Sequence, residues 1–312
     1  MSPFCSRRIL KPPRTDLTVH SPKDFREDPY LATAIIARQL AKGRLNLFLG
    51  AGVSAGFGLP NWTKLVARVL DHEDDYSTQL DQMSEPDVAK LLDPLDDASS
   101  KYQEKVHRAL YKTAAPDLLR QLSVSPLLLA VAGLLTGSCR GRIQRVFTYN
   151  YDDLLEQYLR MLGYACCVRT APNDLSDWSD VEINYVHGYL PKSWKPDQPI
   201  YELILSNKSF RNRRADIDRG WSASVENSLC TKLGLFMGLS GDDSSIFDVL
   251  KRAQKQVGRG TDPLGFWLMT PDAYDRNAGS VQDVNMSPLR LAKEDFPEFV
   301  FRVCQKAVGD VS

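Results

Sequence analysis

Apolar residues recur at two spacings along most of the chain, and the two spacings alternate. Compact apolar runs predict buried strands near 45–49, 144–148, 165–169, 183–186, 202–205, 235–238 and 266–269. Between them, apolar positions at helical spacing predict helices near 30–42, 62–70, 152–162, 222–233 and 245–256. Strands separated by helices predict an α/β fold with a doubly wound, mostly parallel sheet.

Three segments depart from this alternation. From 71 to 142, acidic loops alternate with helical stretches at 101–112 and 125–135, which predicts a helical insertion or small domain. Residues 1–28 are rich in proline and charge without a period, so we interpret them as an N-terminal arm, with 29–312 as the main domain. Near the C-terminus, the stretch 295–308 places four large apolar residues on one helical face, which favours a core or assembly contact: Phe296, Phe299, Val300 and Val303.

A glycine-rich loop follows the first predicted strand. Residues 50–55, Gly-Ala-Gly-Val-Ser-Ala, fit the pattern Gly-x-Gly-x-x-Gly/Ala between a strand and a helical segment. Glycines let the backbone approach a pyrophosphate, and unpaired N–H groups at a helix start favour negative charge; the alternative is a tight structural turn. A dehydrogenase would show an acidic residue at the end of a second strand about 20 positions later. Asp71 has that spacing, but 65–70 continues a helix, so the simple dehydrogenase pattern fails.

Four motifs in order resemble those of sirtuins. They are Gly50-Ala51-Gly52-Val53-Ser54 with Gly58-Leu59-Pro60, similar to the opening NAD loop; Phe147-Thr148-Tyr149-Asn150-Tyr151-Asp152, similar to Thr-x-Asn-x-Asp; Val186-His187-Gly188, similar to the catalytic His-Gly; and Phe236-Met237-Gly238-Leu239-Ser240, similar to the Gly-x-Ser turn. Together they span about two thirds of the chain, and each lies at the end of a predicted strand, where open α/β sheets bind ligands. The resemblance implies a Rossmann-like, NAD-binding catalytic domain over 29–312.

Departures from the sirtuin pattern narrow the resemblance. Sirtuins that deacylate proteins carry a zinc module with two Cys-x-x-Cys pairs, and the six cysteines here form no such pair, so we expect no metal. Asn61-Trp62 stands where those enzymes show Asp-Phe-Arg, and 153–156 are expected to extend Asn150 into an uninterrupted helix. The chain thus resembles the bacterial sirtuin-like NAD-hydrolase branch, known mostly from antiphage defence, whose members deplete NAD when a partner or ligand activates them.

The resemblance assigns roles that suit the side chains concerned. Cleavage of the nicotinamide–ribose bond develops positive charge on the ribose, and Asn150 can orient a water and a hydroxyl while staying neutral. His187 suits proton transfer, since an unperturbed imidazole titrates near ~6.5. Asp152 resembles the aspartate of the nicotinamide pocket. The residues expected to bind NAD are Gly50, Ala51, Gly52, Ser54, Pro60, Asp152, Gly238 and Ser240.

Each assignment has a structural alternative. Asn150 precedes a good helix start and can be its cap, and a lone histidine such as His187 is more often a core or surface residue. Asp153 is better suited to favour the first helical turn electrostatically than to bind NAD. The run 240–243 can cap the helix from Ser245, or Ser240 can contact the adenosine side of NAD.

Composition bears on partners and location. The chain has 39 Lys plus Arg and 39 Asp plus Glu, so no global field attracts a polyanion, and direct nucleic-acid binding is disfavoured. The strongest basic cluster, 211–214, is interpreted as facing solvent or a protein partner. The longest apolar run, 126–135, is shorter than the ~20 residues of a membrane span, and no signal peptide is visible. Scattered cysteines indicate reduced thiols, and we expect a cytoplasmic protein.

The expected function is that of an NAD glycohydrolase that converts NAD, its substrate, into nicotinamide and ADP-ribose. By resemblance, such a chain forms a homo-oligomer and works beside a companion such as a hexameric DNA-translocase-type ATPase or an Argonaute-like protein. One alternative is a sensing or scaffold module that binds NAD or ADP-ribose without turnover. A protein deacylase is a further alternative, which the missing cysteine pairs disfavour.

Overall fold

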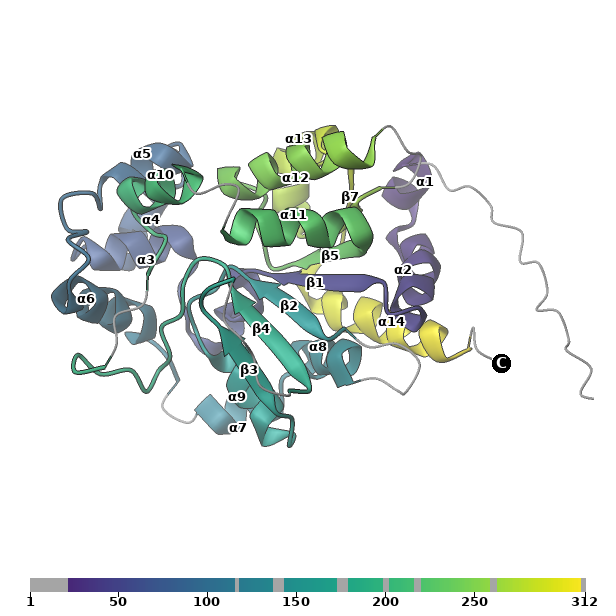
Figure 1. Ribbon diagram of the computed structural model, residues 1–312, viewed down its shortest axis with the longest axis horizontal. Coiled ribbons are helices and arrows are strands. Elements are labelled where there is room, and N and C mark those ends of the chain that lie inside the picture. The colour runs from purple at the N-terminus through teal and green to yellow at the C-terminus, as the bar shows by residue number, and fades with distance from the viewer. Residues whose placement is uncertain are drawn as a thin grey trace, which may run out of the picture.

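The computed structural model describes residues 22–115, 118–136, 143–172, 179–198, 202–215, 220–258 and 263–309. Seven strands form one parallel sheet in the order β3-β4-β2-β1-β5-β6-β7 (Figure 1). The strands are β1 (Leu45–Leu49), β2 (Arg145–Thr148), β3 (Cys166–Arg169), β4 (Val181–Tyr185), β5 (Leu233–Met237), β6 (Gly265–Met269) and β7 (Met286–Arg290). Strands β2, β3 and β4 lie on one side of β1, and β5, β6 and β7 lie on the other. The predicted doubly wound parallel sheet is therefore confirmed.

Helices cover both faces of the sheet. Helices α11, α12 and α13 lie over one face, α2, α8 and α14 lie over the other, and α3 to α6 gather with α10 beyond one end (Figure 1). The helices are α1 (Pro22–Glu27), α2 (Ala32–Ala41), α3 (Trp62–Val69), α4 (Ser77–Leu80), α5 (Glu85–Lys90), α6 (Ser100–Tyr111), α7 (Leu118–Ser123), α8 (Pro126–Thr136), α9 (Leu154–Met161), α10 (Asn207–Ala215), α11 (Trp221–Thr231), α12 (Ser244–Val257), α13 (Pro271–Asp283) and α14 (Phe296–Gly309).

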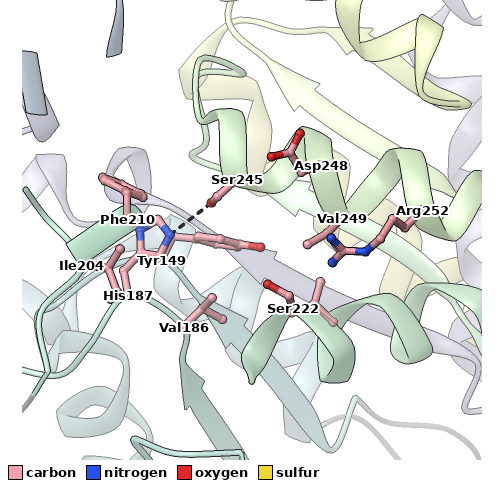
Figure 2. A pocket seen from close by; sticks show the side chains of 11 residues that line it. Tyr149, Val186, His187, Ile204, Phe210, Ser222, Ser245, Asp248, Val249 and Arg252 are labelled. Carbon is pink, nitrogen blue, oxygen red and sulfur yellow. Dashed lines mark hydrogen bonds between the residues drawn. The ribbon is translucent and has the colours of Figure 1, made fainter. Parts of the chain in front are cut away.

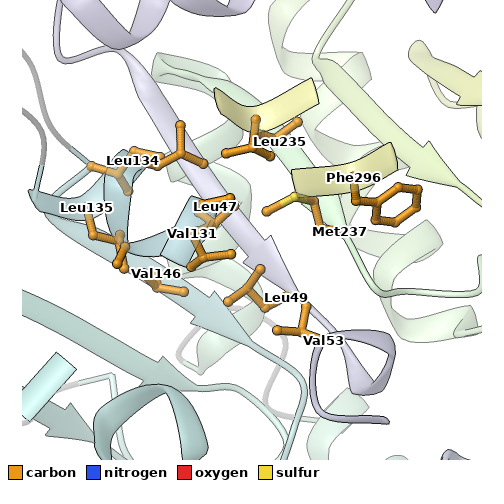
Figure 3. Close-up of a cluster of buried hydrophobic side chains, with 14 of the residues drawn as sticks. Leu47, Leu49, Val53, Val131, Leu134, Leu135, Val146, Leu235, Met237 and Phe296 are labelled. Atoms are coloured by element: carbon orange, nitrogen blue, oxygen red, sulfur yellow. The ribbon is translucent and has the colours of Figure 1, made fainter. Parts of the chain in front are cut away.

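Alternation along the central strand supplies a core to each face. Leu47 and Leu49 point toward α8 and α14, where they join Val131, Leu134 and other aliphatic side chains (Figure 3). Phe48 points to the opposite face, because successive strand residues alternate. There its ring stacks on Phe147 at 5.1 Å and on Phe236 at 4.3 Å between ring centroids. These contacts hold β1, β2 and β5 together, and the carboxyl ends of those strands carry three of the four motifs.

A third cluster of buried residues packs α3, α4, α5 and α6 against the segments that follow β2 and β4. Tyr151 comes from the first of those segments, and Leu190, Trp194 and Leu203 come from the second. The helices predicted at 101–112 and 125–135 are both present, but they belong to different cores, because α8 packs under the sheet with α14. Within the predicted insertion of 71–142, α4, α5 and α6 therefore pack in this cluster, whereas α8 packs in the main core.

The last residues of the predicted arm belong to the core. Positions 1–21 lie outside the described residues, but 22–27 form α1, which packs against β7. The Phe25 side chain is buried, and its ring meets that of Phe266 edge-on at 5.3 Å. An apolar side chain of this size stabilises a fold by about 1.5–3 kcal/mol when it is fully buried. The arm interpretation is wrong from position 22 onward for this reason.

Two strand predictions also need correction. Residues 202–205 form no strand: they run as a loop whose apolar side chains are buried, and Ile204 N donates to His187 O at 2.8 Å. Strand β7 was not predicted, because Pro288 removes a hydrogen-bond donor. The proline is tolerated since β7 pairs only with β6 and forms the edge of the sheet. Within the described ranges, no helix has the length and apolar character to span a membrane.

A buried arginine of helix α3 forms an ion pair with Asp74, whose side chain is 41% exposed. The Arg68 side chain is 4% exposed, and its Nε and Nη2 donate to the two carboxylate oxygens of Asp74, both at 2.6 Å. We expect Asp74→Ala to lower the free energy of unfolding by about 2–3 kcal/mol, because it leaves a buried guanidinium without its counter-ion. The matched control is Asp87→Ala, which removes an exposed pair with Lys90 and should leave the stability close to that of wild type. Urea denaturation of both variants measures the difference, and equal losses would contradict the prediction.

Candidate functional site

The four sequence motifs gather at one edge of the sheet. The residues after β1, β2, β4 and β5 carry them, and these strands are neighbours in the order β4-β2-β1-β5. In parallel strands the carboxyl ends share one edge, and the chain crosses from one side of β1 to the other between β1 and β5, the kind of position where open α/β sheets bind ligands. The topology therefore brings the predicted NAD loop, the Asn150 segment, the His187 segment and the Gly238 turn to the same edge.

The glycine loop is packed directly on the turn after β5. Gly50 N donates to Met237 O at 3.0 Å, and Gly52 N donates to Gly238 O at 2.8 Å. A Cβ at Gly52 would lie 2.7 Å from the Gly238 Cα, closer than real Cβ contacts allow. The N–H groups of Gly50 and Gly52 are therefore not unpaired, contrary to the expectation for a phosphate loop. The structural alternative, a close crossing of two backbones, accounts for both glycines.

The segment after the loop also differs from the predicted loop-to-helix arrangement. Residues 51–53 and 55–57 form two short 3-10 turns, in which Val53 N and Ser54 N donate within the loop. Helix α3 begins only at Trp62, after the buried Pro60 and the N-cap Asn61. Of the predicted NAD-binding residues here, Ala51 is half-buried and Ser54 is buried. Ser54 is the loop residue whose side chain reaches the next motif.

A buried polar cluster links Ser54 to the segment after β2. Asn150 Nδ2 donates to Ser54 Oγ at 3.0 Å, and Asn150 N donates to Thr148 Oγ1 at 3.1 Å. Asn150 is 9% exposed, and its Oδ1 has no hydrogen-bond partner among the described residues. Asp152 is also buried and shares a side-chain hydrogen bond with Ser54. The amide oxygen of Asn150 is therefore a shielded acceptor, held in place by its own amide nitrogen.

Asn150 is not a helix cap, and the predicted uninterrupted helix after it is wrong. Residues 150–152 have no helical structure, and α9 begins at Leu154 with Asp153 as its N-cap residue. Asp152 Oδ1 accepts a hydrogen bond from Leu154 N at 3.1 Å. Local hydrogen bonding by an aspartate competes with helix propagation and explains the later start. The extra nonhelical residues let Asn150 turn toward Ser54.

Asp153 has a structural role beyond the first turn of α9. Its Oδ1 accepts from Lys192 N at 3.2 Å and from the Tyr111 hydroxyl at 3.3 Å, and its Oδ2 accepts from Gln157 Nε2 at 2.7 Å. These bonds join α6, α9 and the loop after β4. Asp153 thereby fixes the segment that carries Asn150 and Asp152.

His187 packs against Tyr149 and lies beside the start of α12. Its Nε2 lies 3.4 Å from Ser245 Oγ, a contact that Figure 2 marks with a dashed line. The same Nε2 is 3.6 Å from Asp243 Oδ2. Its ring meets Tyr149 edge-on at 4.9 Å and Phe210 at 5.6 Å. His187 is 8% exposed, so the aromatic rings and the α12 start hold it in one orientation. It also lines a small pocket between α11 and α12.

The two candidate catalytic residues thus lie at the ends of adjacent strands but in separate groups. Asn150 belongs to the cluster with Ser54 and Asp152, whereas His187 borders the pocket, which Asn150 does not line. Tyr149 connects the groups, since it precedes Asn150 in the chain and packs on His187.

The turn after β5 supplies a helix cap. Asp243 is the N-cap of α12, and its Oδ1 accepts from Ser245 N at 2.8 Å. Ser240 is exposed, and its carbonyl accepts from Asn277 Nδ2 at 3.0 Å. The capping alternative for 240–243 is therefore correct for Asp243. Ser240 remains a predicted adenosine contact.

Several residues near His187 were not singled out from the sequence. Tyr149, Asp243 and Ser245 contact it, and Arg252 lines the same pocket two helical turns along α12. The spacing of Asp243 and Ser245 signals a helix cap, but nothing local places that cap against His187. Among the described residues, no group of three or more His, Cys, Asp or Glu side chains can hold a metal ion.

Burial shifts the proton affinity of Asp152. Desolvation raises the pKa of Asp152 to about 6, although the Ser54 hydroxyl and the Leu154 N–H oppose the shift. The native state therefore binds a proton that the unfolded chain, with an aspartate pKa near ~3.9, has lost between about pH 4 and pH 6. The free energy of unfolding should therefore fall as the pH rises from about 4 to about 6. At higher pH it should stay lowered by the full cost of burying the Asp152 carboxylate.

The isosteric variant Asp152→Asn tests this cost. We expect it to raise the free energy of unfolding by about 2–3 kcal/mol at pH 7.5, because it removes a buried charge. The gain should vanish near pH 4, where wild-type Asp152 is protonated in both states. Denaturant titrations at several pH values measure the difference. A gain that is the same at pH 4 and pH 7.5 would contradict the assignment.

Comparisons with known proteins agree with part of the resemblance. No curated protein matches the chain significantly. Among solved structures, the chain is similar to one described as a Sir2 homologue in complex with NAD, at 13% identity and a TM-score of 0.46, over 88% of this chain and 94% of that one. Residues 144–289, just under half of the chain, match the family model of the SIR2-like domain. The part of the chain that carries Asn150, His187 and Gly238 is therefore similar to the SIR2-like domain family, as the sequence motifs indicated.

Proposed function

We propose that this chain is an NAD glycohydrolase, which cleaves the nicotinamide–ribose bond of NAD with water. The observation that carries the proposal is the buried, unpartnered Oδ1 of Asn150, held by the bond from Nδ2 to Ser54. A neutral amide acceptor at this position suits a ribose hydroxyl or a water beside a developing cation, because it orients without adding a full charge. His187, at the end of the adjacent strand, is the proposed proton acceptor.

Asp152 complements this assignment. In the proposal, its carboxyl group accepts the carboxamide N–H of nicotinamide, as the sirtuin resemblance implies. The Gly238 turn and Ser240 lie on the other side of the β1 loop, where the proposal places the adenosine half of NAD. The N–H groups of Gly50 and Gly52 are already paired. In the proposal, the loop therefore contacts the dinucleotide through van der Waals packing, by Gly50, Ala51, Gly52 and Pro60.

Binding without turnover is the second candidate. Backbone packing explains Gly50 and Gly52 in either case, so the glycine loop is compatible with NAD binding without cleavage. Protein deacylation is disfavoured, because the chain lacks the two Cys-x-x-Cys pairs of the zinc module that protein-deacylating sirtuins carry.

The test is to incubate the full chain with NAD and to quantify the products by chromatography. We expect nicotinamide and ADP-ribose in equal amounts, and no product that depends on an acetylated peptide. Calorimetry with NAD distinguishes binding without turnover. If the folded chain, alone and with any protein that co-purifies with it, binds NAD and leaves it unchanged, the hydrolase proposal is wrong.

On the family resemblance alone, we propose that the activity depletes cellular NAD in bacterial antiphage defence. The same resemblance suggests a homo-oligomer activated by a companion, such as a hexameric DNA-translocase-type ATPase or an Argonaute-like protein. The co-purification step above identifies such a companion, and NAD turnover before and after its addition measures activation.

A further inference from the structure

The pocket beside His187 is a narrow slot between α11 and α12. It begins at Tyr149 and His187 and runs along α12 past Ser245 to Arg252 (Figure 2). Ser245 and Arg252 are seven residues apart, which corresponds to about 10 Å along a helix. Val225 of α11 and Val249 of α12 are the aliphatic side chains of these two helices that line it. The slot therefore connects the imidazole with the interior of the helix pair.

The far end of the slot holds a buried donor that needs a partner. Arg252 Nε donates to Glu226 Oε2 at 2.6 Å, but Arg252 Nη2 is buried and has no hydrogen-bond partner among the described residues. Ser222 and Asp248 place further polar groups on the wall near it (Figure 2). A buried guanidinium N–H without a partner is costly, and ordered water is the usual solution.

The size of the slot matches water. Its volume of about 30 Å³ has room for one or two water molecules and for little else. Polar groups at both ends can hold them: Ser245 and His187 at one end, and Ser222 and Arg252 at the other. The valine walls exclude a bulkier molecule.

We propose that this slot binds the water that attacks NAD and that its valine walls select water over larger acceptors. The proposal rests on the hydrolase function above. In the step, the water oxygen forms a bond to the anomeric carbon of the ribose, and the carbon–nitrogen bond breaks with its electron pair going to the nicotinamide nitrogen. The proton leaves the water for His187 and then for solvent, which gives ADP-ribose, nicotinamide and one proton.

The acceptor selection can be measured by competition between water and methanol. In buffer containing methanol, wild type should form ADP-ribose with little methyl ADP-riboside. Val249→Ala removes two methyl groups from the wall and should raise the ratio of methanolysis to hydrolysis by about tenfold. Ser222→Val, which replaces a polar wall group with an apolar one, should lower hydrolysis by about tenfold and leave NAD binding unchanged. Val124→Ala and Ser123→Val, both on or next to α7 and exposed, are the matched controls.

The outcomes separate this inference from the proposed function. If wild type hydrolyses NAD but Val249→Ala keeps the wild-type product ratio, the slot is not the acceptor site and the hydrolase function stands. If folded wild type, with any co-purified partner, does not cleave NAD, the hydrolase function and the catalytic role of the slot both fail. A crystal structure of the full chain gives a readout apart from activity: ordered water within hydrogen-bond distance of Arg252 Nη2 supports the proposal, and a dry slot overturns it.

Discussion

Replacing Asn150 with alanine should lower NAD turnover by on the order of 10²- to 10³-fold, the cost of losing one preorganised polar group at a reacting centre. The loss should fall mainly on kcat, because the Oδ1 of Asn150 is proposed to orient the ribose in the transition state. His187→Ala should cost a similar factor by removing the proton acceptor. Nicotinamide release under saturating NAD measures both.

Matched controls keep this result interpretable. Asn227→Ala, on the exposed surface of α11, and His72→Ala, exposed after α3, remove the same side chains away from the site. Asn150→Asp keeps the size of the side chain but replaces the Nδ2 donor to Ser54, so it tests the amide itself. If Asn150→Ala folds and retains wild-type turnover, the chemistry lies elsewhere in the molecule.

Most strands of the sheet other than β7 were predictable because they are compact apolar runs in which most residues are buried. Leu45–Leu49 and Gly265–Met269 show the pattern most clearly, with every residue buried. The loop at 202–205 carries the same pattern for another reason: it is buried between His187 and the helices near α5. Apolar runs report burial, and burial alone does not distinguish a strand from a packed loop.

The start of α9 was not predictable from local propensity. The sequence after Asn150 has good helix formers, yet the carboxylate of Asp152 accepts from Leu154 N, and Asp153 bonds to Tyr111 from α6. Tertiary contacts therefore decide where this helix begins. The consequence reaches the site, because a helix from Asn150 onward would not have left these residues free to turn toward Ser54.

The side chains around His187 come from residues that are still farther away in the sequence. Phe210 comes from α10, Ser245 and Arg252 come from α12, and each lies more than 20 residues from His187 in the chain. A sequence motif can identify His187 as a residue that follows a strand. Its neighbours come from helices that are distant in the sequence, and a local motif does not identify them. The sequence consequently predicted the edge of the sheet where the candidate site lies, and it missed the slot beside it.

Gly238→Ala should have the largest effect on the fold. Gly238 has φ of +73°, and a Cβ there would lie 2.8 Å from both Gly50 O and Val53 N. These are backbone atoms of a loop that is itself bonded to β5, so neither partner can move without breaking the bond from Gly52 N to Gly238 O. We expect a loss of about 3 kcal/mol or more in the free energy of unfolding, from left-handed strain plus overpacking.

Two control substitutions separate the causes of that loss. Gly258 has φ of +77° and ψ of −169°, with nothing within 4 Å of a built Cβ, so Gly258→Ala should show a positive-φ conformational cost without overpacking, about 1–3 kcal/mol. Gly56 lies in the loop after β1 with open space around it, and Gly56→Ala should change stability little. Urea denaturation ranks the three variants, and the excess loss of Gly238→Ala over Gly258→Ala reports the crossing of the two backbones. If the two losses are equal, the close packing of the β1 and β5 loops does not stabilise the edge on which the candidate site is built.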